Sequence, residues 1–554
     1  MTLTSRLFAR WGHLPRAKTH DIVVERALRV KMPDGVELLA DHYYAREGGE
    51  KDPIILARSP YGRNSLWGLT SRMLAERRYQ AVVQSVRGTF GSGGEFNPEI
   101  NEARDGIATM NWLKEQKWFS GKVAMIGPSY LGYVQWAVAT NSPPEYLKAV
   151  VPFITASQFR GVTFPGDSLA LDTFLSWIYL VHRQEKIGRI QGFLSQYRTR
   201  SALKPAFEHV PLNDADELVL GEKDRIYQET ISNETNGTQF WEDRDHSAEV
   251  KNVGVPVHLI GGWYDIFLPY QIDDYLSLKA SGRITPFLTI GPWFHVSIGG
   301  FFESFKESLA WYDNYLREDG SKLRKDPVRV FVMGQKQWLT FPEWPPPQMK
   351  IVNWYLRAKK VLDSKIPSPD EDSSPETYDY DPKDPTPSIG GAVLGYHAGP
   401  KDNRQVERRA DVLSYTNVPF REDYTIIGPL SVDLFVESSL KNTDFCARLC
   451  DVAPGGRSIN ISDGLLRLTP IGFQRYIGSD GISRIAFNLW PTAHTFLKDH
   501  RMRLQVSSGA HPRFARNLGS GEPLATGKNF VTAHQKVYHD ARHPSSVLVP
   551  SLIR

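Results

Sequence analysis

The sequence predicts a mostly parallel α/β sheet that is interrupted by a block of helices and followed by a separate strand-rich region. Short apolar strands alternate with helical segments from residue 21 to residue 153, which is typical of a parallel sheet. From residue 156 to residue 249 this alternation stops and helical periodicity takes over. Beyond Pro327, short strands follow one another without helices between them. A chain of 554 residues is also too long for a single core.

The first part of the chain begins with a predicted β-hairpin, in which Asp34-Gly35 separates two alternating runs. Buried strands are predicted at residues 53–58 and 81–86, with a helix between them. A glycine-rich loop, residues 87–94, follows the second strand. It lacks the Gly-Lys-Ser/Thr ending of a phosphate-binding loop and the spacing of a dinucleotide fingerprint. We therefore interpret it as a tight loop beside an active site.

The helical block is predicted to be a cap over the carboxyl edge of the sheet, where ligands bind in open α/β folds. The sheet resumes with strands at residues 255–260 and 286–290. Many short strands separated by Pro and Gly turns then favour a β-sandwich or jelly roll. The expected domains are a core of residues 1–155 and 250–326, a helical cap of residues 156–249, and a jelly-roll β-sandwich of residues 327–554.

Composition narrows the classes of function. Hydrophobic residues make up 41% and charged residues 23% of the chain, which is ordinary for a globular protein. A net charge of +4, without a basic run interleaved with aromatics, gives no support for a nucleic-acid partner. Cys446 and Cys450 are expected to be reduced thiols rather than a disulfide or a metal site. No segment suits a signal peptide or a membrane span, so we expect a cytoplasmic protein whose N-terminal arm packs on the fold.

A serine on a sharp strand-to-helix turn is predicted at Ser129. The stretch KVAMIGPSYLGY, residues 122–133, gives a short buried strand, a Gly-Pro-Ser-Tyr-Leu-Gly turn and an apolar helix. This is a variant of the G-x-S-x-G nucleophile elbow in which the second glycine, Gly132, falls one position late. The motif alone also fits an ordinary strand-to-helix turn, so its meaning depends on the rest of the chain.

Two further residues stand where a serine nucleophile needs partners. A base must reach the serine, and a carboxylate must orient that base. In α/β-hydrolases these residues occur in the order Ser, Asp or Glu, His, each just after a sheet strand. Ser129, Asp265 and His295 follow three predicted strands in that order. Each one alone could be an ordinary loop or pocket residue, but the ordered set predicts a catalytic triad.

An oxyanion hole requires hydrogen-bond donors beside the nucleophile. The backbone N–H of Tyr130 is one expected donor. The second normally comes from the loop after an earlier strand, where Ser59-Pro60-Tyr61-Gly62 stands. A tyrosine hydroxyl is a competent donor to an oxyanion. From the residues alone, Tyr61 could equally be an aromatic lid on the pocket.

Five motifs carry a family resemblance: Pro60-Tyr61, Arg87-Gly88 ahead of Gly91-Ser92-Gly93-Gly94, Gly127 to Gly132, Gly262 to Asp265, and Gly291 to His295. Together they resemble the cocaine esterase and X-prolyl dipeptidyl-peptidase family of serine hydrolases, over nearly the whole chain. The resemblance implies an α/β-hydrolase core, a helical cap, a C-terminal jelly roll and no cofactor. It also implies Ser129 as nucleophile, His295 as base, Asp265 as orienting acid, and Tyr61 hydroxyl with Tyr130 N–H as the oxyanion hole.

We therefore expect a serine hydrolase that cleaves a small-molecule carboxylic ester or amide through an acyl-enzyme. Leu131 stands where the amino-ester hydrolase branch has Glu, which argues against that branch, and the residues after Asp265 (266–269) make the adjoining pocket bulky and apolar. An X-Pro dipeptidyl-peptidase, or a β-lactam acylase or α-amino acid ester hydrolase, stays an alternative, although we assign no anionic site for a substrate amine. A carbohydrate-binding protein with a relic pocket is the alternative of a different class. We expect no metal, nucleic-acid or membrane partner, and the resemblance leaves a homo-oligomer open.

Overall fold

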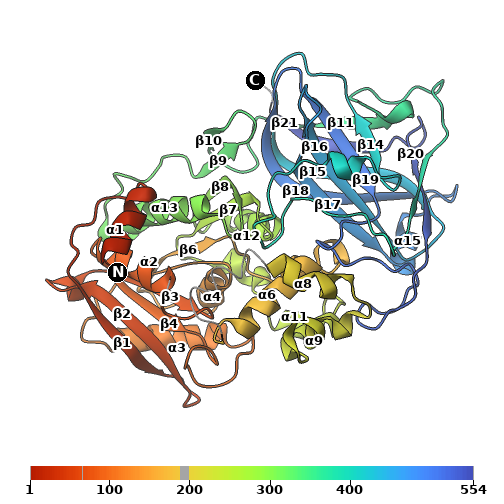
Figure 1. The fold of residues 1–554 in the computed structure, drawn as a ribbon. Helices are drawn as coiled ribbons and strands as arrows, with labels where there is room; N and C mark the ends of the chain where they lie inside the picture. Colours follow the sequence, from red (N-terminus) through yellow and green to blue (C-terminus); the bar gives the residue numbers. More distant parts are fainter. Residues whose placement is uncertain (1, 65, 187–198, 553–554) are drawn as a thin grey trace.

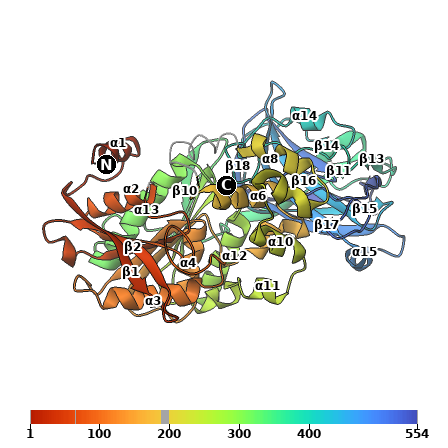
Figure 2. The same cartoon turned by 60° about the horizontal axis from the view of Figure 1, so that its bottom comes forward.

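The computed structural model describes residues 2–64, 66–186 and 199–552, and two sheets organise them (Figure 1). A 10-stranded sheet forms the N-terminal part and an 11-stranded sheet the C-terminal part. Helices cover the first sheet, and a further group of helices lies beside both sheets (Figures 1 and 2). Among the described residues, no helix combines the length and apolar character that a membrane span requires.

The first sheet begins with an antiparallel hairpin and continues as parallel strands. Its strands are β1 (Ile22–Lys31), β2 (Glu37–Ala45), β3 (Ile54–Ser59), β4 (Gln80–Ser85), β5 (Val123–Pro128), β6 (Leu147–Phe153), β7 (His258–Tyr264), β8 (Phe287–Phe294), β9 (Val328–Val332) and β10 (Gln337–Phe341). They lie in the order β1-β2-β4-β3-β5-β6-β7-β8-β9-β10. Pairing is parallel from β4 through β9 and antiparallel at both ends.

Helices cover both faces of this sheet, as is usual for parallel sheets, and its central strands are therefore apolar on both faces. One hydrophobic cluster joins the sheet to α3 (Glu102–Lys114) and α12 (Leu268–Ser281). The other joins it to α2 (Leu66–Ala75) and α13 (Ile298–Arg317). Helix α4 (Tyr130–Ala139) follows β5 and is buried along its whole length. The parallel pairing brings the carboxyl ends of β5, β7 and β8 to one edge of the sheet.

The described residues between β6 and β7 are mostly helical, and these helices share a hydrophobic cluster of their own. Leu175, Leu203 and Tyr227 belong to this cluster, and Ala515 of the C-terminal part joins it. The N-terminal helix α1 (Thr2–Trp11) packs Phe8 against Phe302 of α13. The α-helices that the structure describes between β6 and β7 are α5 (Arg160–Thr163), α6 (Leu171–Arg183), α8 (Thr199–Glu208), α9 (Ala215–Leu220), α10 (Arg225–Ser232) and α11 (Gln239–Glu242).

The C-terminal sheet is antiparallel except where β12 meets β14. Its strands are β11 (Met349–Arg357), β12 (Val361–Asp363), β13 (Glu376–Tyr380), β14 (Leu413–Thr416), β15 (Tyr424–Ser438), β16 (Thr443–Val452), β17 (Ser458–Leu468), β18 (Ser483–Phe496), β19 (Arg501–Ser507), β20 (Ala533–Tyr538) and β21 (Ser546–Leu552). Cys446 and Cys450 lie on β16 as buried free thiols, as predicted.

The first sheet extends beyond the domain boundary that the sequence pattern suggests at residue 327. The sequence pattern assigns the strand after Pro327 to the C-terminal domain, whereas β9 pairs in parallel with β8 and β10 closes a hairpin with β9. Both strands therefore complete the first sheet. The reason is that β9 alternates buried and half-buried residues, a pattern that suits an outer strand of either sheet and does not specify its partner.

Candidate active site

Ser129 lies on a strained turn between β5 and α4. Its backbone has φ 55° and ψ −127°, which is a sparsely populated conformation for a residue with a side chain. Glycine is needed on either side of this serine because a larger side chain would collide with its neighbours. A Cβ on Gly127, whose φ is 148°, would lie 2.3 Å from the Cβ of Leu131, and one on Gly132 would lie 2.3 Å from the Cγ2 of Thr155. The late second glycine is thus required by the wall that Thr155 forms.

His295 and Asp265 form a tight pair at the same edge of the sheet. The Nδ1 of His295 lies 2.7 Å from the Oδ2 of Asp265, whose side chain is buried. The Oδ1 of Asp265 accepts the backbone N–H of Phe267 at 2.8 Å. From the C-terminal part, Trp490 donates its indole N–H to the backbone carbonyl of Asp265 at 3.0 Å. A carboxylate can only accept here, so the imidazole proton sits on Nδ1 and the Nε2 lone pair is free.

Tyr61 follows β3 and directs its hydroxyl to the serine. This oxygen accepts the indole N–H of Trp177 at 3.1 Å and is hydrogen-bonded to the Ser129 hydroxyl. Burial raises the pKa of Tyr61 to about 12, although these two hydrogen bonds oppose the shift. The phenol therefore keeps its proton at neutral pH and can act as a donor.

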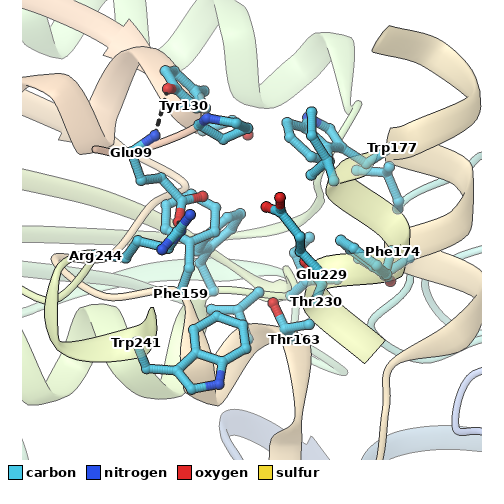
Figure 3. Close-up of a pocket in the computed structure, with 18 of the residues that line it drawn as sticks. Glu99, Tyr130, Phe159, Thr163, Phe174, Trp177, Glu229, Thr230, Trp241 and Arg244 are labelled. Atoms are coloured by element: carbon cyan, nitrogen blue, oxygen red, sulfur yellow. Dashed lines mark hydrogen bonds and ion pairs between the residues drawn. The ribbon is translucent and has the colours of Figure 1, made fainter. Parts of the chain in front are cut away.

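Tyr130 begins α4, so its backbone N–H has no acceptor within the helix and is available beside Ser129. Its side chain points away from the serine. The hydroxyl accepts the backbone N–H of Glu99 at 2.9 Å (Figure 3) and donates to Glu102 at 2.8 Å. Glu102 in turn forms a buried ion pair with Arg58 at 2.7 Å. This chain of contacts fixes the residue whose amide faces the site.

Ser129 and His295 open onto one cavity of about 80 Å³, several times the space that a single water needs. Its walls are mainly apolar and aromatic, and α6 and α10 supply one side (Figure 3). Ile266 and Phe267 belong to the walls, in line with the bulky pocket expected after Asp265. The aromatic lining residues are Tyr61, Tyr130, Phe159, Phe174, Trp177, Phe240, Trp241 and Phe267.

Three ionisable residues of this cavity, Glu99, Glu229 and Arg244, belong to no sequence motif. Burial raises the pKa of the Glu99 carboxyl to about 8, although Arg244 opposes the shift. The Nε of Arg244 lies 4.0 Å from Glu99, and its guanidinium stacks on the ring of Phe240. Figure 3 shows the Glu229 carboxylate pointing into the cavity, across from Glu99 and Arg244. Glu99 lies in the loop after β4, Glu229 on α10 and Arg244 in the turn after α11. None of them belongs to a sequence motif, so only the tertiary structure reveals them.

The structure adds detail to two interpretations made from the sequence. The glycine-rich loop at residues 87–94 contributes no lining residue to the cavity, which is lined instead by residues 97–99 just beyond it. Its Phe90 ring packs on Gly62 and so supports the loop of Tyr61 from behind. Leu131 is fully buried and packs against Gly127 instead of lining the cavity. Its identity therefore says little about the charge of the substrate.

Comparisons with known proteins cover nearly the whole chain. Residues 34–297 match the model of the X-Pro dipeptidyl-peptidase (S15 family), and residues 322–548 match the X-Pro dipeptidyl-peptidase C-terminal non-catalytic domain. Cocaine esterase of Rhodococcus sp. (strain MB1 Bresler) is 29% identical over 95% of this chain and 98% of its own length.

Two solved structures share the fold at 22% identity, each covering 97% of this chain and 98% of the other. They are an aminopeptidase from a marine sediment Thaumarchaeota archaeon, with a TM-score of 0.81, and an α-amino acid ester hydrolase, with a TM-score of 0.78. With the family matches, they confirm the predicted α/β-hydrolase core with a C-terminal β domain. The chain belongs to the cocaine esterase and X-prolyl dipeptidyl-peptidase family of serine hydrolases.

Proposed function

We propose that the chain is a carboxylesterase in which Ser129 is the nucleophile, His295 the general base and Asp265 the residue that orients the base. One observation carries the proposal. The strained Ser129 turn and the Asp265–His295 pair follow three different strands, and they meet at one aromatic cavity although Asp265 and His295 lie 136 and 166 residues after Ser129 in the sequence. The curated relative that matches along nearly its full length is named an esterase, which favours esters over amides.

The geometry supports acyl transfer in two halves. Ser129 Oγ attacks the substrate carbonyl carbon while its proton passes to the free Nε2 of His295. The imidazolium that forms is stabilised by Asp265 at 2.7 Å. Collapse of the tetrahedral intermediate breaks the bond to the alcohol, which takes the proton from Nε2. Water then attacks the acyl-enzyme with His295 again as base, and Ser129 recovers its proton.

The developing oxyanion would be held by the Tyr130 amide and the Tyr61 hydroxyl. Helix α4 points its first N–H groups, the positive end of its dipole, at this place. A neutral phenol supports a donor role because its pKa of about 12 keeps it protonated. Donors that are already in place cost no reorganisation when charge develops, and each one typically contributes about a hundred- to a thousandfold to turnover.

A second candidate is a hydrolase of substrates that carry a free amine, such as amino esters or X-Pro peptides. The observation that favours it is the pair of carboxyl groups, Glu99 and Glu229, in an otherwise apolar cavity. Glu229 is held by Arg225 at 3.0 Å on its outer side. A bound ammonium would favour the ionised form of Glu99 by direct charge attraction.

A serine-directed probe tests the main proposal. Wild-type protein should hydrolyse a p-nitrophenyl ester and be labelled by a fluorophosphonate, and Ser129→Ala should lose both. Ser142→Ala is the matched control, because Ser142 is also a residue of positive φ but lies exposed after α4. Turnover or labelling that survives in Ser129→Ala would refute the assignment. A wild-type protein that neither turns over esters nor reacts would favour the carbohydrate-binding alternative.

Paired substrates separate the two candidates. An ester with an α-amino group should be compared with the same ester lacking it, in wild type and in Glu229→Gln. A carboxylesterase for neutral substrates should show similar kcat/KM for both esters and little change in the variant. A severalfold preference for the amino ester that disappears in Glu229→Gln would establish the second candidate.

A further inference from the structure

The end of cap helix α6 is hydrogen-bonded to the loop that carries Tyr61. Besides the contact from Trp177 to the Tyr61 hydroxyl, Gln184 donates its side-chain N–H to the backbone carbonyl of Pro60 at 2.9 Å. Glu185 accepts the backbone N–H of Phe90 at 3.0 Å, and Phe90 is the residue that packs behind Gly62. One short stretch of the cap thus contacts the hydroxyl, the backbone and the support of the same loop.

The contact from Trp177 fixes the direction in which the Tyr61 hydroxyl can donate. An indole N–H is only a donor, so the phenol oxygen must accept at that point. The single phenol proton is then left for the other side, where Ser129 lies. Accepting one hydrogen bond also polarises the O–H group and strengthens its own donation.

The base of α6 is anchored independently of the substrate cavity. Asp172, in its first turn, donates its backbone N–H to the carbonyl of Pro512 at 2.9 Å, and its carboxylate lies 2.9 Å from Nε2 of His397. Both partners belong to the C-terminal part of the chain. Helix α6 therefore connects the C-terminal part of the chain to the Tyr61 loop. Along the way, Phe174 and Trp177 of this helix line the cavity.

We propose that α6 positions the oxyanion donor, with Trp177 as the positioning residue that holds and aims the Tyr61 hydroxyl. The inference rests on the proposed function, because it presumes that this hydroxyl stabilises the oxyanion. Trp177 acts through Tyr61 in this role. Its loss should therefore lower kcat with little effect on KM, whereas a wall residue that only contacts the substrate should mainly change KM.

A double-mutant cycle on a p-nitrophenyl ester tests the proposal. Tyr61→Phe should lower kcat by about a hundred- to a thousandfold. Trp177→Phe keeps an aromatic wall and removes only the indole donor, so kcat should fall by about tenfold, the size of one lost hydrogen bond. In the double variant, kcat should match that of Tyr61→Phe within about twofold, because residues that act through one group are not additive.

Two further variants distinguish positioning of Tyr61 from contact with the substrate. Gln184→Ala removes the contact to Pro60 at a half-buried position and should lower kcat severalfold, again without effect in the Tyr61→Phe background. Phe174→Leu, on the same helix and in the same cavity, is the control that should change KM and spare kcat. Thermal unfolding of each variant shows whether the fold is intact.

Three results would overturn the inference, and they differ in whether the oxyanion role of Tyr61 also falls. If Trp177→Phe leaves kcat unchanged or changes only KM, or if its effect multiplies fully with that of Tyr61→Phe, Trp177 is a wall residue and the oxyanion assignment stands. If Tyr61→Phe itself leaves kcat unchanged, the oxyanion role of Tyr61 falls, and the positioning role falls with it.

Discussion

Replacing Asp265 by Asn tests the orienting role most directly, because the structure dictates which way the amide must face. The Asp265 carboxylate accepts the Phe267 N–H at 2.8 Å through Oδ1 and contacts the His295 Nδ1 at 2.7 Å through Oδ2. Only the carbonyl oxygen of Asn can accept from the Phe267 backbone. Its NH₂ group must then face Nδ1 and donate to it, which moves the imidazole proton to Nε2.

An imidazole protonated on Nε2 cannot take the proton of Ser129. The same exchange in the Ser-His-Asp triad of a serine protease lowers kcat by about 10⁴ while the geometry is kept. We therefore expect Asp265→Asn to lower kcat by about 10³- to 10⁴-fold, which corresponds to ~4–5 kcal/mol of activation free energy. KM should change little, because Asp265 lies behind His295 and is not a wall of the cavity.

The measurement is kcat for a p-nitrophenyl ester near pH 7.5, with the unfolding temperature of each variant as a check on folding. Asp274→Asn is the matched control: Asp274 is buried on α12 and bonded to Ser157, and burial raises its pKa to about 8. It is thus largely neutral near pH 7, and an amide imitates it well. A loss of less than about tenfold in Asp265→Asn, or an equal loss in Asp274→Asn, would refute the reasoning.

Three other outcomes follow. Because burial raises the pKa of Glu99 from 4.5 to about 8, the stability of the protein should fall as the pH rises from about 4.5 to about 8. In Glu99→Gln the unfolding temperature should depend less on pH over this range, and an unchanged dependence would contradict this. Gly132→Ala should destabilise the protein by about 1–3 kcal/mol in denaturant unfolding, because its methyl group meets Thr155. Cys446 and Cys450, whose pKa values burial raises to about 12, should react with a thiol reagent only upon unfolding.

The placement of the candidate site residues at one edge of the sheet could be predicted because strand order determines it. Ser129, Asp265 and His295 each follow an apolar strand, and in a parallel sheet the carboxyl ends of strands meet at one edge. The strand that begins at Val328 could not be assigned to its sheet, because its alternating burial suits an outer position in either one. The hydrophobic pattern of a segment indicates whether it is a helix or a strand, whereas the strand it pairs with depends on long-range packing.

The cap residues could not be predicted for a related reason. The periodicity of residues 169–180 indicates a helix, and α6 begins and ends close to that stretch. Which face of the helix meets Tyr61 depends on how the cap docks on two separate parts of the chain. Trp177 and Glu229 therefore look like ordinary members of amphipathic helices until the helices are packed.

The charge of the substrate has to be decided by the cavity and not by the elbow. Leu131 differs from the Glu that the amino-ester branch carries, but its side chain fills the space against Gly127 and is fully buried. A residue that never reaches the cavity cannot select a substrate there. The carboxyl groups that do reach it, Glu99 and Glu229, come from the loop after β4 and from α10. An amine-binding role in this chain would thus use positions remote from the elbow, and Glu229→Gln is the substitution that decides it.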